Sequence, residues 1–488
     1  MIAIRMRASR SQRRLLIFLS LVSIGALVAM IGAESTRAAE PDVAGHWQGT
    51  LETGVVDLRI VFNIAKSPEG RLTATMDSPD QGAKGLPIET AALEGNVLTL
   101  EARRIGGTYQ GTISADGRRI KGEWRQSGQT MALDLTRLEK EPDYRRPQDP
   151  TKPYPYEERE VTVENAAGGV KLAGTLTLPK AAGAVPAVVL LTGSGAQDRD
   201  ESILGHKPFL VLADYLTRRG IAVLRLDDRG VGESTGSTSN STTTDLAGDA
   251  LAAVAYLKTV QQINPRRIGL VGHSDGGIVA PLAASRSSDV AFIVMLAGTG
   301  VPGEQIVLRQ GAIIARAQKA DEKLIASAQE LQKKLFAVAK RDANLEEAKQ
   351  EIIELMRESD SYKSAATAEA KAAVEAQVEA QAQMMFTPWF RSFLTYDPAL
   401  ALAKVHCPVL VLNGEKDLQV DPQQNLPPIA AALKQAGNRD VTIRELPGLN
   451  HLFQHCQTGS PVEYGKIDET FAPEALAEIA DWILARAK

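Results

Sequence analysis

Hydrophobic and polar positions follow two different patterns along the chain. Between residues 41 and 140, short apolar or alternating runs such as GHWQGTLE and VDLRIVFNIA are broken by Gly, Asp and Asn. Short strands with frequent turns are typical of a small antiparallel sandwich or barrel. The pattern therefore predicts a small all-β domain over residues 41–140. Trp47 is expected in its core, because a tryptophan on a strand is usually buried.

After residue 160 the apolar runs become continuous. A predicted hairpin, REVTVENAAGGVKLAGTLTLP, is followed by the runs AVVLLTG, IAVLRLD, IGLVG and AFIVMLAG, with predicted helices between them. Strands that are apolar throughout and alternate with helices indicate a parallel sheet covered on both faces. Residues 141–160, which are rich in proline and charge, are predicted to be a linker.

From about residue 301 to 400 the alternation of strands and helices stops. This stretch is rich in Ala, Glu, Lys and Gln, which predicts helices. Its apolar positions do not keep a heptad repeat, which argues against a coiled coil. The sheet pattern then resumes with PVLVLNG and VTIRELPG. We therefore interpret 301–400 as a helical insertion in a second domain that spans 161–488.

Residues 1–38 have the pattern of an export segment. Five arginines lie between Arg5 and Arg14, and a largely apolar, uncharged run follows from Leu15 to Ala33. A cleaved export signal and a retained N-terminal anchor both fit, because the run is nearly long enough to cross a bilayer. The protein is expected in the periplasm or outside the cell, with membrane association if the segment is retained.

Charge and cysteine content narrow the function classes further. The formal net charge is −4 with both signs well mixed, which gives no basic footprint for nucleic acid and favours small, weakly charged substrates. The two cysteines, Cys407 and Cys456, exclude a disulfide framework and leave either one bridge or two separate thiols. The sequence does not fix the oligomeric state.

Two segments match the Gly-x-Ser-x-Gly pattern of a nucleophile elbow. The segment 272–276 follows the apolar strand IGLV and precedes a helix of small residues, which is the context that an elbow requires. The segment 232–236 runs into STSNSTTT, which predicts a loop. Flanking glycines relieve the crowding of so sharp a turn. Ser274 is therefore the candidate nucleophile, and Ser234 is not.

A nucleophilic serine needs a base, and the base needs an acid to fix its tautomer. In proteins with such an elbow the acid and then the histidine follow the serine in the chain. PVLVLNG is followed by three acids, of which Asp417 lies where the strand opens into its loop, while Asp421, next to a proline, is expected at the surface. Among the histidines further on, His451 is the candidate base and His455 is expected to be structural.

Two backbone N–H groups are the candidate oxyanion donors. One belongs to Asp275, directly after the elbow serine, and the other to Ser194 in the glycine-rich loop 191–196. Residues 198–200, Asp-Arg-Asp, are interpreted as an ion-pair cluster that holds this loop. No histidine or metal-ligand spacing accompanies them, so no metal is expected.

Taken together, these motifs resemble α/β-hydrolases of the esterase D type, which are related to serine aminopeptidase-like and dienelactone hydrolase-like enzymes. The matching segments, in order, are TGSGAQDRDE, LDDRGVGEST, VGHSDGG, NGEKDLQV and GLNHLFQ, within 161–488. The resemblance implies an α/β fold: a mostly parallel eight-stranded sheet with helices on both faces and a helical cap after the sixth strand. It also implies triad roles for Ser274, Asp417 and His451. The oxyanion loop departs from many relatives, because it begins with Thr192-Gly193 in place of His-Gly.

The expected function is a serine hydrolase that cleaves small carboxylic esters through an acyl-enzyme intermediate. No cofactor is expected, since the sequence has neither a P-loop nor a dinucleotide-binding motif. A peptidase, amidase or thioesterase on the same triad stays open. A different class also stays open: an envelope-binding protein whose β domain binds cell-wall polymer while the hydrolase domain is inactive or secondary.

Overall fold

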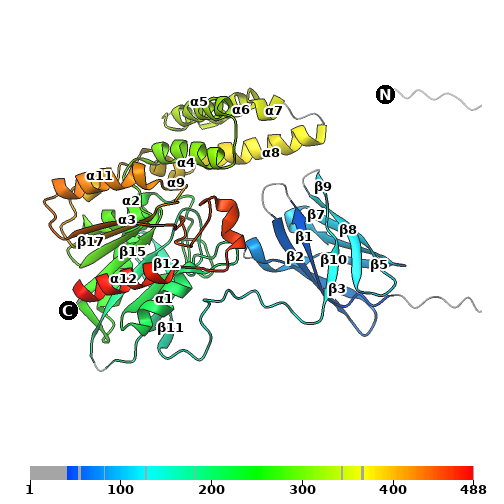
Figure 1. Cartoon of the computed structure of the whole chain (residues 1–488), viewed down its shortest axis with the longest axis horizontal. Helices are drawn as coiled ribbons and strands as arrows, with labels where there is room; N and C mark the ends of the chain where they lie inside the picture. Colours follow the sequence, from blue (N-terminus) through cyan, green and yellow to red (C-terminus); the bar gives the residue numbers. More distant parts are fainter. Residues whose placement is uncertain are drawn as a thin grey trace, which may run out of the picture. The chain divides into compact units, whose positions relative to one another are not determined.

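The computed structural model describes residues 41–52, 57–81, 83–126, 129–181, 183–341, 345–363 and 368–486. The predicted export segment lies outside these residues. The described chain contains an N-terminal all-β domain and an α/β domain, each built on its own sheet (Figure 1). Within the described residues, no helix has the length and apolar character needed to cross a membrane.

The N-terminal domain is one antiparallel sheet of ten strands in the order β4-β3-β2-β1-β10-β8-β7-β6-β5, with β9 paired to β8. Alternate side chains point into a single core that contains the fully buried Trp47, Phe62 and Tyr109. The prediction for Trp47 is therefore confirmed. The strands are β1 (Gly45–Glu52), β2 (Asp57–Lys66), β3 (Leu72–Ser78), β4 (Ala83–Ile88), β5 (Thr90–Glu94), β6 (Val97–Ala102), β7 (Gly107–Ile113), β8 (Arg119–Gln126), β9 (Gln129–Ala132) and β10 (Leu135–Leu138).

Two of these strands have weak signals in the sequence. Strand β4 has the sequence AKGLPI, in which glycine and proline interrupt the apolar pattern, and β5 is only five residues long. Both pair with strands that do alternate clearly, β3 and β6. Pairing therefore decides their conformation where local propensity does not.

The predicted linker is fastened to the α/β domain by side chains that bind backbone carbonyls. The Arg146 guanidinium donates to the carbonyl oxygens of Leu204, Gly465 and Ile467 at 2.8–3.1 Å. Gln148 accepts hydrogen bonds from the N–H groups of residues 470 and 471. A segment held by this many bonds is not a flexible tether.

The α/β domain has an eight-stranded mixed sheet in the order β11-β12-β14-β13-β15-β16-β17-β18. Strands β13 to β18 are parallel to one another, whereas the β11–β12 hairpin joins the edge through an antiparallel pair with β14. The sheet is thus mixed and less uniformly parallel than expected. The strands are β11 (Glu157–Asn165), β12 (Val170–Leu178), β13 (Val185–Leu191), β14 (Ala222–Leu226), β15 (Ile263–His273), β16 (Phe292–Leu296), β17 (Val409–Gly414) and β18 (Val441–Leu446).

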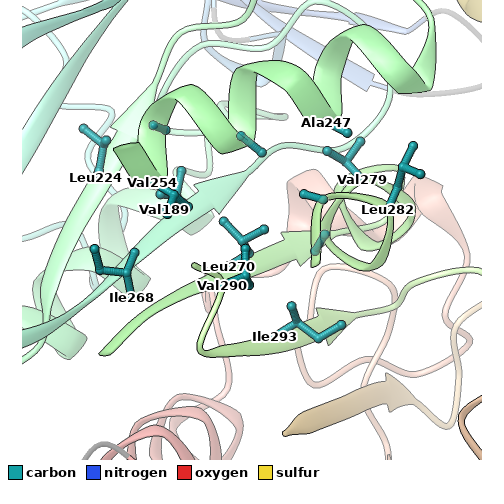
Figure 2. Close-up of a cluster of buried hydrophobic side chains, with 14 of the residues drawn as sticks. Val189, Leu224, Ala247, Val254, Ile268, Leu270, Val279, Leu282, Val290 and Ile293 are labelled. Carbon is teal, nitrogen blue, oxygen red and sulfur yellow. The ribbon is translucent and has the colours of Figure 1, made fainter. Parts of the chain in front are cut away.

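Helices cover both faces of this sheet (Figure 1). Successive strand residues point to opposite faces, so Val189, Leu270 and Ile293 pack under α2, α3 and α11, as Figure 2 shows in part, while Val188, Val271 and Val294 pack under α1 and α12. This two-sided burial explains why the strands are apolar throughout. The helices are α1 (Pro208–Arg218), α2 (Thr243–Lys258), α3 (Gly276–Ala284), α11 (Pro422–Gln435) and α12 (Pro473–Arg486).

The helical insertion lies between β16, the sixth strand of the sheet along the chain, and β17. Its helices have a small core of their own, which includes Phe336, Ile352, Phe390 and Leu394. In Figure 1, α4, α5, α6 and α8 form a layer distinct from the sheet and its covering helices. The helices are α4 (Gly303–Ala317), α5 (Glu322–Ala339), α6 (Leu345–Arg357), α7 (Asp360–Lys363), α8 (Ala368–Met385) and α9 (Pro388–Thr395), with the short α10 (Ala399–Leu402) after them.

Candidate active site

Ser274 lies in the sharp turn between β15 and α3. Its φ angle is 53°, in the left-handed region that residues other than glycine rarely adopt. Its N–H donates to the Leu296 carbonyl at 2.9 Å, and its own carbonyl accepts from Gly277 N–H at 2.9 Å. The surrounding structure thus holds a strained residue between a strand and a helix, as in a nucleophile elbow.

Two glycines are required by the crowding of this turn. A Cβ atom on Gly272 would lie 2.0 Å from the carbonyl oxygen of Gly276, and a Cβ atom on Gly276 would lie 2.2 Å from the carbonyl oxygen of Leu191. Both obstacles are backbone atoms, so no change of rotamer removes the overlap. The turn therefore leaves no room for a side chain at either glycine of the motif.

Ser234, the serine of the second Gly-x-Ser-x-Gly segment, is buried in a loop. Its hydroxyl oxygen accepts a hydrogen bond from Ala173 N–H at 2.8 Å and donates one to the Asp227 carbonyl at 2.9 Å. The side chain thus joins strand β12 to the loop after β14. Its hydrogen-bonding capacity is used in the fold.

Asp417 and His451 form a buried pair. His451 Nδ1 lies 2.8 Å from Asp417 Oδ2, and the two side chains are 5% and 0% exposed. The second oxygen, Oδ1, accepts from the N–H groups of Gln419 and Val420, both at 2.8 Å. A carboxylate held by two backbone donors gives the imidazole a fixed tautomer, with its proton on Nδ1.

The elbow contacts the candidate base, His451, through His273. Its Nε2 lies 3.0 Å from the His451 carbonyl oxygen, and the two imidazole rings are 4.8 Å apart, centre to centre. Within the described residues, neither Ser274 Oγ nor His451 Nε2 makes a hydrogen bond.

The two acids on either side of Asp417 serve other purposes. Glu415 accepts a hydrogen bond from Gly448 N–H at 2.8 Å. Asp421 caps α11 and accepts from Arg309 Nε of α4 at 2.7 Å, so it links helix α4 of the cap to helix α11. The expectation that Asp421 lies at the surface is wrong, because it is 8% exposed.

His455 does not join the site. It lies at the surface with Nδ1 2.9 Å from Glu469 and Nε2 2.8 Å from Glu474. The hydrogen bond to Glu469, reinforced by the charge of both carboxylates, raises the pKa of His455. The two cysteines are free thiols in the structure.

The glycine-rich loop 191–196, which carries the candidate oxyanion donor Ser194, follows β13 and lies next to the elbow. A Cβ atom on Gly193 would be 3.4 Å from Ser274 Cβ. The N–H of Gly193 is already bound to Glu201 Oε1 at 2.7 Å. In the described part of the chain, no partner is found for the N–H groups of Ser194 and Asp275, so these two donors are available to a ligand.

Asp228 holds the same loop from the other side. Its carboxylate accepts from the Thr192 hydroxyl at 2.8 Å and from Gln197 N–H at 2.9 Å. Burial raises the pKa of Asp228 to about 7, although these two hydrogen bonds oppose the shift. The carboxyl group is therefore largely protonated in mildly acidic solution.

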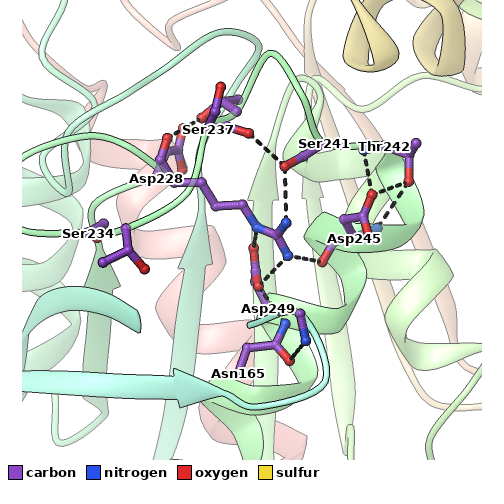
Figure 3. A network of polar contacts seen from close by, with 12 residues as sticks. Asn165, Asp228, Ser234, Ser237, Ser241, Thr242, Asp245 and Asp249 are labelled. Atoms are coloured by element: carbon purple, nitrogen blue, oxygen red, sulfur yellow. Dashed lines mark hydrogen bonds and ion pairs between the residues drawn. The ribbon is translucent and has the colours of Figure 1, made fainter. Parts of the chain in front are cut away.

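The segment that carries Asp228 is itself anchored by a buried ion pair (Figure 3). Arg229 Nε lies 2.6 Å from Asp249 Oδ2, and Asn165 Nδ2 donates to Asp249 Oδ1 at 2.7 Å. In the neighbouring cluster, Arg199 pairs with Asp227 at 2.7 Å. Each of these charged side chains is therefore paired with another side chain of the same chain. Among the described residues, no group of three or more His, Cys, Asp or Glu side chains could hold a metal ion.

The cap reaches the site through Trp389 of α9. Its indole Nε1 donates to Asp275 Oδ2 at 3.0 Å, and its ring stacks on Phe393 at 5.7 Å between centroids. Burial raises the pKa of Asp275. One residue therefore offers its backbone N–H at the elbow and its side chain to the cap.

Sequence reasoning missed Glu201, Trp389 and the roles of Asp228 and His273. Glu201 directly follows the Asp-Arg-Asp segment, yet nothing in the spacing of these acids shows which one turns inward. Its positive φ of 53° and its burial are tertiary properties. Trp389 follows a proline at the end of the helical insertion, where an aromatic residue is equally suited to the cap's own core.

Comparison with known proteins gives a family match. The model of the family described as serine aminopeptidase, S33, matches residues 207–455, just over half of the 488 residues. The chain is also 29% identical over 351 residues to the esterase EstD of Thermotoga maritima, an alignment that covers 70% of each protein.

Solved structures with similar coordinates are α/β hydrolases of low sequence identity. GrgF of Penicillium sp. sh18 has a TM-score of 0.42 and 16% identity, with coverage of 68% of this chain and 99% of GrgF. An esterase of Pyrococcus furiosus has a TM-score of 0.41 and 17% identity, with coverage of 69% and 92%. The fold assignment rests on the family match and on the sheet topology.

Proposed function

The chain belongs to the serine aminopeptidase, S33, family of α/β-hydrolases and is a serine hydrolase, and from that membership we propose that it is a carboxylesterase with Ser274, Asp417 and His451 as its catalytic triad. The observation that carries the proposal is the buried hydrogen bond of 2.8 Å between Asp417 and His451, in a loop that contacts the residue next to Ser274. The similarity to the esterase EstD favours esters as the substrate class.

The proposed reaction passes through an acyl-enzyme. Ser274 Oγ attacks the ester carbonyl while its proton moves to His451 Nε2, and the N–H groups of Asp275 and Ser194 stabilise the oxyanion. Collapse of the tetrahedral intermediate breaks the bond to the alkoxide, which takes the proton from His451. Water then attacks the acyl-serine, gives its proton to His451, and releases the carboxylic acid together with the free serine. Asp417 holds the imidazole and stabilises its charged form throughout.

A second candidate, aminopeptidase activity, is favoured by the description of the matching family. The triad chemistry does not separate esters from amides. A screen of p-nitrophenyl esters of increasing chain length, run beside aminoacyl anilides, tests the two. Ester turnover without anilide turnover supports the esterase, and the reverse result would overturn it.

The cap is proposed to shape the acyl site. An apolar cavity of about 430 Å³ lies among its helices, lined in part by Ala312, Leu335, Met385 and Phe390. Phe390 is the neighbour of Trp389, which contacts the elbow through Asp275. Filling the cavity by Ala312→Leu should therefore change the ratio of kcat/KM between short and long esters.

We also propose that the enzyme acts outside the cytoplasm, because residues 1–38 have the sequence pattern of an export segment. Fusion of this segment to a reporter that is active only after export tests the proposal. Cytoplasmic retention of the fusion would contradict it.

A further inference from the structure

Glu201 and His273 form a buried pair beside the elbow that the proposed reaction does not use. Their side chains are 5% and 8% exposed, and Glu201 Oε1 lies 2.9 Å from His273 Nδ1. The same oxygen accepts a hydrogen bond from Gly193 N–H at 2.7 Å. The other imidazole nitrogen, Nε2, lies 3.0 Å from the carbonyl oxygen of His451. The pair thus touches the oxyanion loop, the elbow and the loop of the base.

The partners of His273 and Glu201 determine which atoms of the pair carry protons. The His451 carbonyl can only accept, so His273 Nε2 must donate to it. Gly193 N–H can only donate, so Glu201 Oε1 must accept from it. A second proton is then needed between His273 Nδ1 and Glu201 Oε1. The pair makes all three hydrogen bonds only while it holds this shared proton, with His273 as an imidazolium beside the Glu201 carboxylate.

We infer that Glu201 and His273 are positioning residues for hydrolysis, which hold the oxyanion loop and the loop of the catalytic base in place against the elbow. The inference rests on the proposed function, because it assigns the base to His451 and an oxyanion donor to the loop of Gly193. Both residues act through the groups that they hold.

The charge environment supports retention of the shared proton. Burial lowers the pKa of His273, but the charge of Glu201 and the hydrogen bonds to Glu201 and the His451 carbonyl outweigh burial and raise it. Asp417 also favours the imidazolium. Of the other groups around the pair, Asp228 has a pKa of about 7, which Glu201 helps to raise. Activity should therefore fall as pH rises through the raised pKa of His273, because the neutral ring cannot donate to both partners.

The test is the Glu201→Gln variant, assayed for ester hydrolysis from pH 5 to pH 10. An amide oxygen at this position leaves the imidazolium without a counter-ion, and an amide nitrogen there opposes Gly193 N–H. We expect kcat to fall by about 10- to 100-fold, as for other displacements of catalytic groups. KM should change much less, and the alkaline limb of the kcat/KM profile should move to lower pH.

Matched controls separate positioning from stability. Asp80→Asn removes the charge of another buried carboxylate, paired with Arg59 in the β domain, and should lower the melting temperature without moving the pH profile. Asp228→Asn tests whether the ionisation of Asp228 causes the alkaline limb of the kcat/KM profile. A limb that moves with Asp228→Asn, or a folded Glu201→Gln enzyme with wild-type kcat and profile, would overturn the inference. If a folded Ser274→Ala enzyme stays active in the same assays, the proposed function fails instead.

Two histidine variants keep the inference testable if Glu201→Gln does not fold. His273→Asn reproduces the Nδ1 donor towards Glu201 and loses the contact to His451. His273→Gln reproduces the Nε2 donor towards the His451 carbonyl and loses the contact to Glu201. Both should lower kcat more than they raise KM, and wild-type kcat in both would contradict the positioning role.

Discussion

The two Gly-x-Ser-x-Gly segments share a sequence pattern and differ in almost every structural property. Ser274 lies between a strand and a helix with a φ angle of 53°, and its hydroxyl has no hydrogen bond within the described residues. Ser234 lies in a loop, and its hydroxyl both accepts and donates a hydrogen bond to the backbone. The pattern alone therefore does not identify a nucleophile. A reactive serine needs an unused hydroxyl next to a base, whereas a structural serine has both of its hydrogen bonds satisfied.

The largest expected difference between the two serines is in catalysis. Ser274→Ala should lower kcat for ester hydrolysis by about 10⁴- to 10⁶-fold with the fold retained, because the attacking atom is lost from a turn that accepts a small side chain. Ser234→Ala should lower it by less than about tenfold, since a buried hydroxyl contributes only hydrogen bonds. A fluorophosphonate probe followed by peptide mass spectrometry should find the label on Ser274 alone. Label on Ser234 would reverse the assignment.

The glycines should separate the two segments as well. Gly272→Ala places a Cβ atom 2.0 Å from a backbone oxygen, so the elbow must shift and kcat should fall by about 10²-fold or more. Gly232→Ala meets only the end of the Asp227 carboxylate at 2.7 Å, at a φ of 56°, and should cost about 1–2 kcal/mol of stability. Kinetics and urea unfolding of both variants check this. Equal losses of activity would show that the loop is as constrained as the elbow.

For stability, the order of the two serine variants should be reversed: Ser234→Ala should lower the free energy of unfolding more than Ser274→Ala does. Ser234→Ala leaves the Ala173 N–H and the Asp227 carbonyl buried without a partner, which should lower the free energy of unfolding by about 1–3 kcal/mol. The Ser274 hydroxyl makes no hydrogen bond within the described residues, so Ser274→Ala breaks none. The melting temperature of this variant should therefore stay close to that of the wild type. Thermal melts at one pH make the comparison. A Ser234→Ala protein as stable as the wild type would contradict the structural role.

A further expected effect, on stability alone, concerns Asp228, which holds loop 191–196 through Thr192 and lies in the chain just before the second segment. Its pKa is raised to about 7 in the folded protein, so the folded state binds a proton that the unfolded state releases at about pH 3.9. Stability from this group is therefore lost as pH rises between these values and is constant above about pH 7. Asp228→Asn should raise the melting temperature at pH 8.5 and leave it nearly unchanged at pH 4. A stabilisation that is the same at both values would show that ionisation is not the cause.

Local sequence patterns were sufficient for most of the fold. The central strands β13 to β17 each contain an apolar run, because burial on both faces removes the polar alternation, and the helical insertion follows from its composition. The edge strand β11, EEREVTVEN, keeps an alternation of polar and apolar residues. The outcome for Asp421 shows where such patterns fail. It pairs with Arg309, 112 residues away in the chain, and no local signal reports a partner at that separation.

The residues of the candidate site also fall into two groups: those that local sequence patterns locate and those that only the folded structure brings together. The candidates Ser274, Asp417 and His451 could be selected because their chemistry is tied to strand ends, which local patterns locate. Glu201 and His273 are 72 residues apart in the chain, and their pairing depends on how the oxyanion loop folds back over the elbow. Residues whose function is defined by such a contact can be found only once the fold is known.

The contact between the cap and the elbow has an optical consequence. The chain has four tryptophans, and three of them, Trp47, Trp124 and Trp482, are buried in cores. Trp389 alone donates its indole N–H to a carboxyl group of the site. Because indole emission is sensitive to a neighbouring carboxyl group, the enzyme contains its own fluorescent reporter of the distance between the cap and the elbow.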